Sequence, residues 1–118
     1  AGSNAAINPG AIAFTCSGRN PANAAMRLVK AIDLGAAIAL TGAERITLLK
    51  IDCEGYEENV LRGARDTLFQ WKPVVIVEQK RDMANRFGLK VLGAVEYLTD
   101  AGYRVAEEIS GDYIMVPA

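Results

Sequence analysis

Histidine is absent from the 118-residue sequence, and cysteine occurs only at Cys16 and Cys53. The lack of histidine excludes Ser-His-Asp and Cys-His catalysis and histidine-ligated zinc sites. Two cysteines are too few for a metal cluster or a disulfide framework. Because Cys53 follows a largely apolar run, we expect a reduced thiol in the core. Acid–base chemistry on this chain must therefore use carboxylate, lysine, tyrosine or cysteine side chains.

The sequence also lacks a basic patch and a long apolar segment. Its formal net charge is −1, and its basic residues are scattered, whereas nucleic-acid binding requires a concentrated basic face. No apolar run approaches the roughly 20 residues of a membrane span. We therefore expect a cytoplasmic protein whose partners include neither nucleic acid nor a membrane. The first residues are Ala-Gly-Ser, without an initiating methionine or a signal peptide, so we expect further residues upstream.

The chain is long enough for one small domain with its own core. Residues 1–25 are rich in Gly, Asn, Ala, Pro and Ser, which is typical of an irregular or loosely ordered segment; only residues 11–16 suggest a short strand. We assign residues 26–118 to an α/β domain. It begins with a short strand over residues 26–32 and one or two helical turns over residues 33–40.

Two nearly continuous apolar runs, residues 46–52 and 74–78, dominate the middle of the chain. Such runs are typical of parallel strands buried on both faces. Between them, residues 57–68 have a helical period. The expected inward-facing side chains of this helix are Val60, Leu61, Ala64 and Leu68. Strand, helix and strand together predict a right-handed βαβ unit with adjacent parallel strands.

The C-terminal third predicts a helix followed by two antiparallel strands. Residues 91–101 form the expected helix, with Leu92, Val95 and Leu98 facing inward and Gly102 after its end. Residues 103–109 and 113–116 are strand-like. The sequence Ser-Gly-Asp between them is typical of a hairpin turn. A further turn is expected at Gly88.

Carboxylates follow both central strands. Asp52 ends the first strand, Glu54 lies two residues beyond it, and Glu78 ends the second. Because ligands of open α/β sheets bind beyond the carboxyl ends of parallel strands, we expect these three side chains to converge at one candidate site. Close carboxylates raise one another's pKa, which suits proton acceptance or cation binding. We expect Lys50 to pair with one of them rather than to act as a catalyst.

An alternative interpretation of these acids is structural. Carboxylates at strand ends are common on solvated surfaces, and Glu54 could interact with the first turn of the next helix. The sequence contains no G-x-G-x-x-G or phosphate-binding loop that would point to a nucleotide site.

Residues 48–57, LLKIDCEGYE, resemble the Lys-Ile-Asp-x-Glu-Gly-x-Glu signature of FkbM-family methyltransferases. Four further segments resemble elements of the same family: residues 31–34, 60–64, 73–78 and 100–103. Together they extend the resemblance over approximately residues 26–117.

The resemblance implies an S-adenosylmethionine-dependent methyltransferase with a Rossmann-like class I sheet of seven strands, the last inserted antiparallel. The chain then supplies its C-terminal half, strands four to seven. Asp52 is the candidate cofactor-binding and catalytic residue, orienting the cofactor amine or the acceptor. Glu54 and Glu78 are candidates for a general base or a divalent-cation ligand. The expected acceptor is a hydroxyl group of a small molecule or glycan.

The sequence lacks the family's Asp-x-Gly-x-x-x-Gly cofactor loop and the acidic residue that holds the ribose. We therefore expect weak or no binding of S-adenosylmethionine by this chain alone. Two alternatives stay open: a non-enzymatic α/β interaction module that binds a partner or a second copy through an open sheet edge, and another doubly wound enzyme, such as one that modifies sugars.

Overall fold

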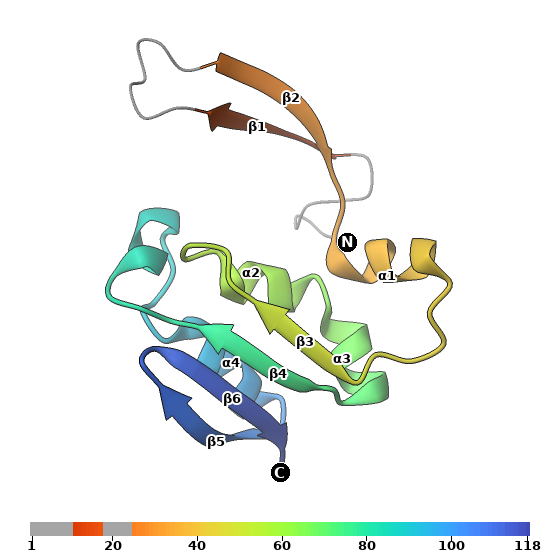
Figure 1. Ribbon diagram of the computed structural model, residues 1–118, viewed down its shortest axis with the longest axis vertical. Helices are drawn as coiled ribbons and strands as arrows, with labels where there is room; N and C mark the ends of the chain where they lie inside the picture. Colours follow the sequence, from red (N-terminus) through yellow and green to blue (C-terminus); the bar gives the residue numbers. More distant parts are fainter. Residues whose placement is uncertain (1–10, 18–24) are drawn as a thin grey trace.

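The computed structural model describes residues 11–17 and 25–118. Its N-terminal part is an antiparallel pair, β1 (Ala11–Ser17) and β2 (Ala25–Ala31), which forms a separate two-stranded sheet (Figure 1). Both short strands expected in this region are therefore present. The rest of the expected irregular segment, residues 1–10 and 18–24, lies outside the described residues, and the domain boundary at residue 25 stays a prediction.

Helix α1 (Leu34–Thr41) follows β2 and has defined caps at both ends. The Asp33 side chain accepts a hydrogen bond from the backbone N–H of Ala36 at 2.7 Å, which satisfies one of the free donors of the first turn. Gly42 ends the helix with φ +70°, a left-handed conformation that glycine adopts without strain. The one or two helical turns expected here are confirmed.

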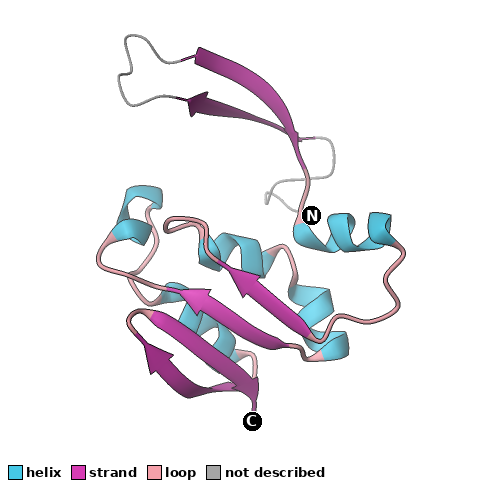
Figure 2. Cartoon of the chain, in the orientation of Figure 1, coloured by secondary structure: helices cyan, strands magenta, loops and turns pink. Residues whose placement is uncertain are grey.

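The main sheet has four strands in the order β3 (Leu48–Ile51), β4 (Val74–Glu78), β6 (Asp112–Pro117) and β5 (Tyr103–Ile109). Strands β3 and β4 are adjacent and parallel, as predicted. The last strand, β6, is inserted between β4 and β5 and runs antiparallel to both (Figure 2). The chain thus forms an α/β fold with a mixed sheet.

A two-residue loop connects β5 to β6. Ser110 and Gly111 both have positive φ, +52° and +92°. Two central residues with positive φ match the twist of a tight antiparallel hairpin. The predicted turn is confirmed.

The single helix predicted over residues 57–68 is wrong: this segment forms two short helices, α2 (Glu57–Arg62) and α3 (Arg65–Trp71). The break lies at Gly63 and is explained by a contact with α1. Its carbonyl accepts a hydrogen bond from the backbone N–H of Gly35 in α1 at 3.2 Å, instead of continuing the helical ladder. A Cβ at Gly63 would lie 3.1 Å from Cβ of Asp33, so glycine also permits this close approach.

The C-terminal helical region consists of the 3₁₀ helix η1 (Met83–Phe87), a turn at Gly88 with φ +74°, and α4 (Gly93–Asp100). The predicted turn and the glycine after α4, Gly102 with φ +96°, are both confirmed. Leu92, expected to face inward, is exposed because it lies at the N-cap, before the helix begins. The longest described helices have 8 residues, and none is long and apolar enough to cross a membrane.

The core lies between one face of the sheet and the helices α2, α3 and α4. Leu61, Leu68 and Leu98 pack from the helices onto buried side chains of the strands. Those strand residues are Ile51, Val75, Val77, Tyr103 and Met115. The Tyr103 hydroxyl also donates a hydrogen bond to the carbonyl of Pro73 at 2.7 Å, so its polar atom is satisfied within the core.

Burial on both faces of β3 and β4, expected from their apolar runs, is wrong for the described structure. Along β4, Val75 and Val77 are buried, whereas Val74 and Ile76 are only partly covered. Along β3, Leu48 is exposed. The reason is that α2, α3 and α4 pack on the same face, and among the described elements none builds a second layer over the other.

Replacing Leu61 tests the core described above. Leu61 is 0% exposed, so we expect Leu61→Ala to lower the free energy of unfolding by about 2–5 kcal/mol through lost burial and the cavity left behind. Phe69→Ala is the control, because Phe69 is 82% exposed. Urea unfolding of both variants measures the difference, and a loss below about 1 kcal/mol for Leu61→Ala would contradict this packing.

Candidate functional site

The register of β3 and β4 places two of the predicted acids side by side. The last pair in this register is Ile51 with Val77, so the next residues along the two parallel strands are Asp52 and Glu78. Their side chains are close enough to share a hydrogen bond, and the carboxylate of Glu54 also acts on Asp52 through its charge. The predicted convergence of Asp52, Glu54 and Glu78 at the carboxyl end of the strands is therefore present.

The pKa of Asp52 is raised above its ordinary value. Partial removal of water by neighbouring protein atoms is the largest cause, followed by the negative charges of Glu78 and Glu54. The hydrogen bond with Glu78 and the charge of Glu57 act in the same direction. An acid whose pKa is raised is a stronger proton acceptor when ionised.

Lys80 is the cationic side chain beside the three acids. Sequence analysis did not identify it as their partner. Its Nζ lies 2.9 Å from the carboxylate of Glu78, and this hydrogen bond is the main reason that the pKa of Lys80 is raised. Lys50, expected to be the partner of a carboxylate, takes part in none of the ion pairs found among the described residues.

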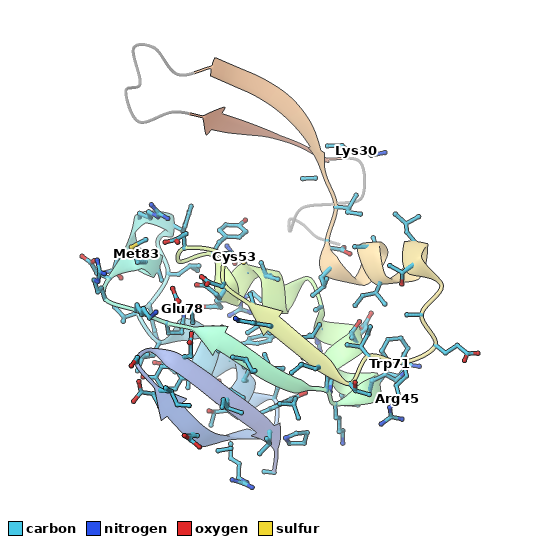
Figure 3. All side chains as sticks on the ribbon, in the orientation of Figure 1. Lys30, Arg45, Cys53, Trp71, Glu78 and Met83 are labelled. Carbon is cyan, nitrogen blue, oxygen red and sulfur yellow. The ribbon has the colours of Figure 1, made fainter. Side chains whose placement is uncertain are left out.

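A sharp turn follows Asp52 and presents Glu54. Glu54 and Gly55 have φ of +54° and +106°. A Cβ at Gly55 would lie only 2.3 Å from the carbonyl oxygen of Met83, so the turn approaches η1 too closely for any side chain at this position. The Arg86 guanidinium of η1 donates a hydrogen bond to the Glu54 carbonyl. Figure 3 shows Cys53, Glu78 and Met83 at the same end of the sheet, away from Trp71.

Beside the turn, the rings of Tyr56 and Phe87 meet edge to face with centroids 5.0 Å apart. The guanidinium carbon of Arg86 lies 5.1 Å from the centre of the Phe87 ring. Two aromatic rings and a guanidinium group thus lie beside the turn that carries Glu54.

Glu57 is the acid that binds the backbone of this turn. Sequence analysis had included Glu57 in the family signature and in the predicted helix, but had given it no role in the site. Glu57 is 1% exposed, and its carboxylate accepts hydrogen bonds from the turn. Sequence reasoning instead assigned an interaction with the helix start to Glu54. A signal was present: Glu57 is the last acid of the signature, two residues after a glycine.

The space among these side chains is small. A cavity of about 10 Å³ is lined by residues from the turn, the end of β4 and η1, including Glu54, Glu57, Glu78 and Met83. This volume is enough for about one water molecule. Across the part of the chain that is described, no three His, Cys, Asp or Glu side chains are arranged to hold a metal ion. This cavity is therefore too small to enclose a ligand larger than water.

Cys53, between Asp52 and Glu54, is a free thiol that packs partly against the core, as expected. Burial raises its pKa, and the charges of Glu57 and Asp52 raise it further. The thiol is therefore kept protonated, which opposes a nucleophilic role.

Comparison with known proteins identifies the family. The model of the FkbM methyltransferase domain matches residues 24–105, which include the candidate site. The chain therefore belongs to the FkbM methyltransferase domain family. No curated protein and no solved structure matches the sequence. The catalytic roles expected for Asp52, Glu54 and Glu78 stay predictions.

Replacing Gly55 tests the turn. Gly55→Ala introduces both a Cβ clash with Met83 and a left-handed alanine. Gly42→Ala is the matched control, since Gly42 has φ +70° but no atom within 4 Å of the added Cβ. We expect the control to cost about 1–2 kcal/mol and Gly55→Ala to cost clearly more. Equal losses in urea unfolding would show that the contact with η1 is unimportant.

The raised pKa of Asp52 predicts a pH-dependent stability difference. Above this pKa, the ionised carboxylate is less favourable in the folded than in the unfolded chain. Asp52→Asn removes the charge, so we expect the variant to be more stable than the wild type at neutral pH. The gain should shrink as the pH falls through the raised pKa and vanish below the ordinary pKa of aspartate.

Thermal unfolding of Asp52→Asn between neutral and acidic pH measures this difference, with Asp66→Asn on the exposed surface of α3 as control. A variant that is less stable than the wild type at neutral pH would mean that the Asp52 carboxylate makes net favourable interactions in the folded state.

Proposed function

We propose that this chain is the C-terminal half of an S-adenosylmethionine-dependent methyltransferase domain that transfers a methyl group to a hydroxyl acceptor. The main support for the proposal is that the segment matched by the family model contains the cluster of Asp52, Glu54 and Glu78. Asp52, Glu54 and Glu78 meet at the carboxyl end of parallel strands, where α/β sheets bind their ligands.

The strand order supports the Rossmann-like part of the proposal. A last strand inserted antiparallel between its two predecessors is what the C-terminal half of a class I methyltransferase sheet implies, and β6 lies between β4 and β5 in this way. At the other margin, β3 is an edge strand of the described sheet. In our proposal the sheet of the complete enzyme continues beyond β3.

The donor set of the site fits the cationic end of S-adenosylmethionine. Three carboxylates offer acceptor oxygens for a charged amine, and the side chain of Asp52, which hydrogen-bonds with Glu78, is exposed. The cavity beside Glu54 and Glu78 holds about one water molecule and is too small for an adenine or a ribose. This agrees with weak cofactor binding by the chain alone.

When bound, S-adenosylmethionine supplies an activated methyl group. Correct positioning of the reactants then provides much of the rate enhancement. We assign this positioning role to Asp52. Glu54 or Glu78 accepts the proton of the acceptor hydroxyl as general base. Lys80 holds Glu78 in place through their ion pair. The rings of Tyr56 and Phe87, beside the turn, are candidate contacts for the acceptor.

A second candidate is the non-enzymatic interaction module. The edge position of β3 and the partly covered second face of the sheet favour it, because an open parallel edge can pair with a strand of a partner. The experiment below separates the two candidates.

The test uses two measurements. Calorimetry of the 118-residue chain with S-adenosylmethionine should show weak or no binding. In a longer polypeptide that includes the N-terminal half of the domain, Asp52→Asn should retain the fold and lower methyl transfer by about 100-fold through lost positioning. Asp66→Asn, the same change on exposed α3, is the control and should leave turnover unchanged.

Micromolar binding by the 118-residue chain would contradict its assignment as an incomplete cofactor site. Undiminished turnover of Asp52→Asn would remove Asp52 from the site. A longer polypeptide that lacks any methyl transfer would instead support the interaction module.

A further inference from the structure

The carboxylate of Glu57 is the most completely buried acid among the described residues, and its hydrogen bonds go to the turn that carries the site. Glu57 Oε2 accepts from the backbone N–H of Cys53 at 2.6 Å, and both carboxylate oxygens accept from Gly55, at 3.1 and 3.2 Å. These two donors flank Glu54 in the chain. One side chain thus fixes the backbone on both sides of a candidate catalytic residue.

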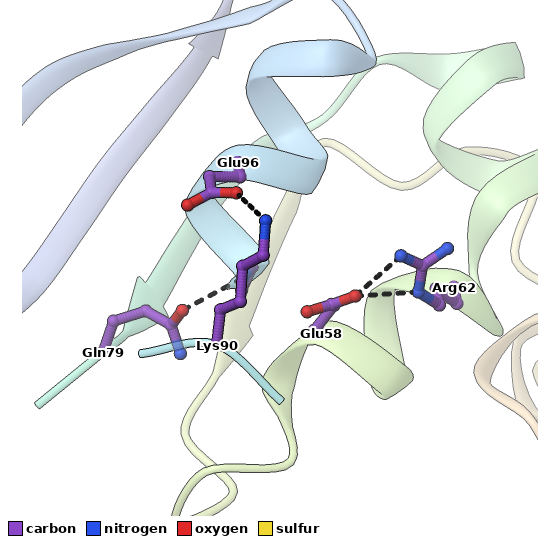
Figure 4. A network of polar contacts seen from close by, with 6 residues as sticks. Glu58, Arg62, Gln79, Lys90 and Glu96 are labelled. Carbon is purple, nitrogen blue, oxygen red and sulfur yellow. Dashed lines mark hydrogen bonds and ion pairs between the residues drawn. The ribbon is translucent and has the colours of Figure 1, made fainter. Parts of the chain in front are cut away.

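A third donor connects Glu57 to the rest of the fold. The Gln79 Nε2 donates to Glu57 Oε1 at 3.2 Å and to the Glu78 carbonyl at 3.2 Å. The Gln79 Oε1 accepts from the backbone N–H of Ala94 at 3.0 Å, at the start of α4 (Figure 4). Gln79 is itself only 6% exposed. The buried pair therefore joins the turn, the end of β4 and the first turn of α4.

The charge of Glu57 is stabilised by these N–H groups rather than by a cation. Within the described part of the chain, no ion pair includes Glu57. Hydrogen bonds to an ionised acceptor are roughly twice as strong as neutral ones. A buried carboxylate with several N–H donors is therefore a strong constraint on the peptide groups that it binds.

An ordinary role for an acid at a helix start is to bind the free N–H groups of its own first turn. The contacts of Glu57 differ from that role. Glu57 is the first residue of α2, but its backbone donors, Cys53 and Gly55, precede the helix. The carboxylate is thus directed back toward the turn.

We propose that Glu57 is a positioning residue that clamps the Cys53 and Gly55 peptides and so holds Asp52 and Glu54 in place beside Glu78. Asp52 directly precedes the first clamped peptide, and Glu54 lies between the two. The close approach of Gly55 to Met83 limits the turn from the opposite side. The clamp itself is independent of the activity, whereas its effect on catalysis rests on the proposed function.

The first test measures the clamp in the 118-residue chain by NMR. In Glu57→Gln, we expect hydrogen-exchange protection of the Cys53 and Gly55 amides to fall by about tenfold, because a neutral acceptor replaces a charged one. The pKa of Asp52 should also fall, since Glu57 contributes to raising it. Glu58→Gln is the control: the carboxylate of Glu58 binds Arg62 at 2.6 Å (Figure 4) and makes none of the hydrogen bonds to the turn, so neither readout should change.

A second measurement needs no substitution and so holds even where Glu57→Gln fails to fold. In the wild-type chain, hydrogen-bond scalar couplings should connect the Cys53 and Gly55 amide nitrogens to the carboxyl carbon of the Glu57 side chain. The absence of both couplings, or unchanged protection in a folded Glu57→Gln, would overturn the clamp.

The catalytic effect is measured in the longer polypeptide. Glu57→Gln should lower kcat by about tenfold or more with little change in acceptor KM, because misplaced groups lose rate before they lose binding. If Glu57→Gln loses the protection of the Cys53 and Gly55 amides but keeps the wild-type kcat, the positioning role is overturned. A wild-type polypeptide without methyl transfer would refute the proposed function while the NMR results still decide the clamp.

Discussion

Parallel pairing of β3 with β4 is the constraint on which the site depends. Parallel strands end at the same edge of a sheet, and the register that pairs Ile51 with Val77 brings the next residues, Asp52 and Glu78, together. Nothing local in either segment attracts two carboxylates to each other. The hydrogen bonds of the ladder and the apolar side chains beneath it hold them close. Loss of water around Asp52 and the nearby charge of Glu78 together raise the pKa of Asp52.

The core that supports this pairing is built on one face. Leu61, Leu68 and Leu98 cover the sheet from α2, α3 and α4, so the helices fix β3 and β4 against each other without enclosing them. β3 is thereby left as an edge strand of the described sheet.

Electrostatic repulsion among the acids is offset by donors from the backbone and from two side chains. Lys80 pairs with Glu78, whereas Glu57 is bound by N–H groups of the turn and by Gln79. The two sets of contacts differ in solvent exposure. The Lys80 ion pair is partly solvated and can adjust, but the buried contacts of Glu57 are rigid, which suits a group that positions its neighbours.

The sequence alone determined the parallel βαβ unit, the terminal hairpin, the three convergent acids and the family, because apolar runs, turn residues and a dense signature are local patterns. Tertiary structure decided the rest. The helix break at Gly63 depends on a hydrogen bond from Gly35, and the role of Glu57 depends on donors that only a folded turn presents. The choice of Lys80 over Lys50 and the one-sided burial of the sheet likewise follow from contacts between distant segments, which no local pattern encodes.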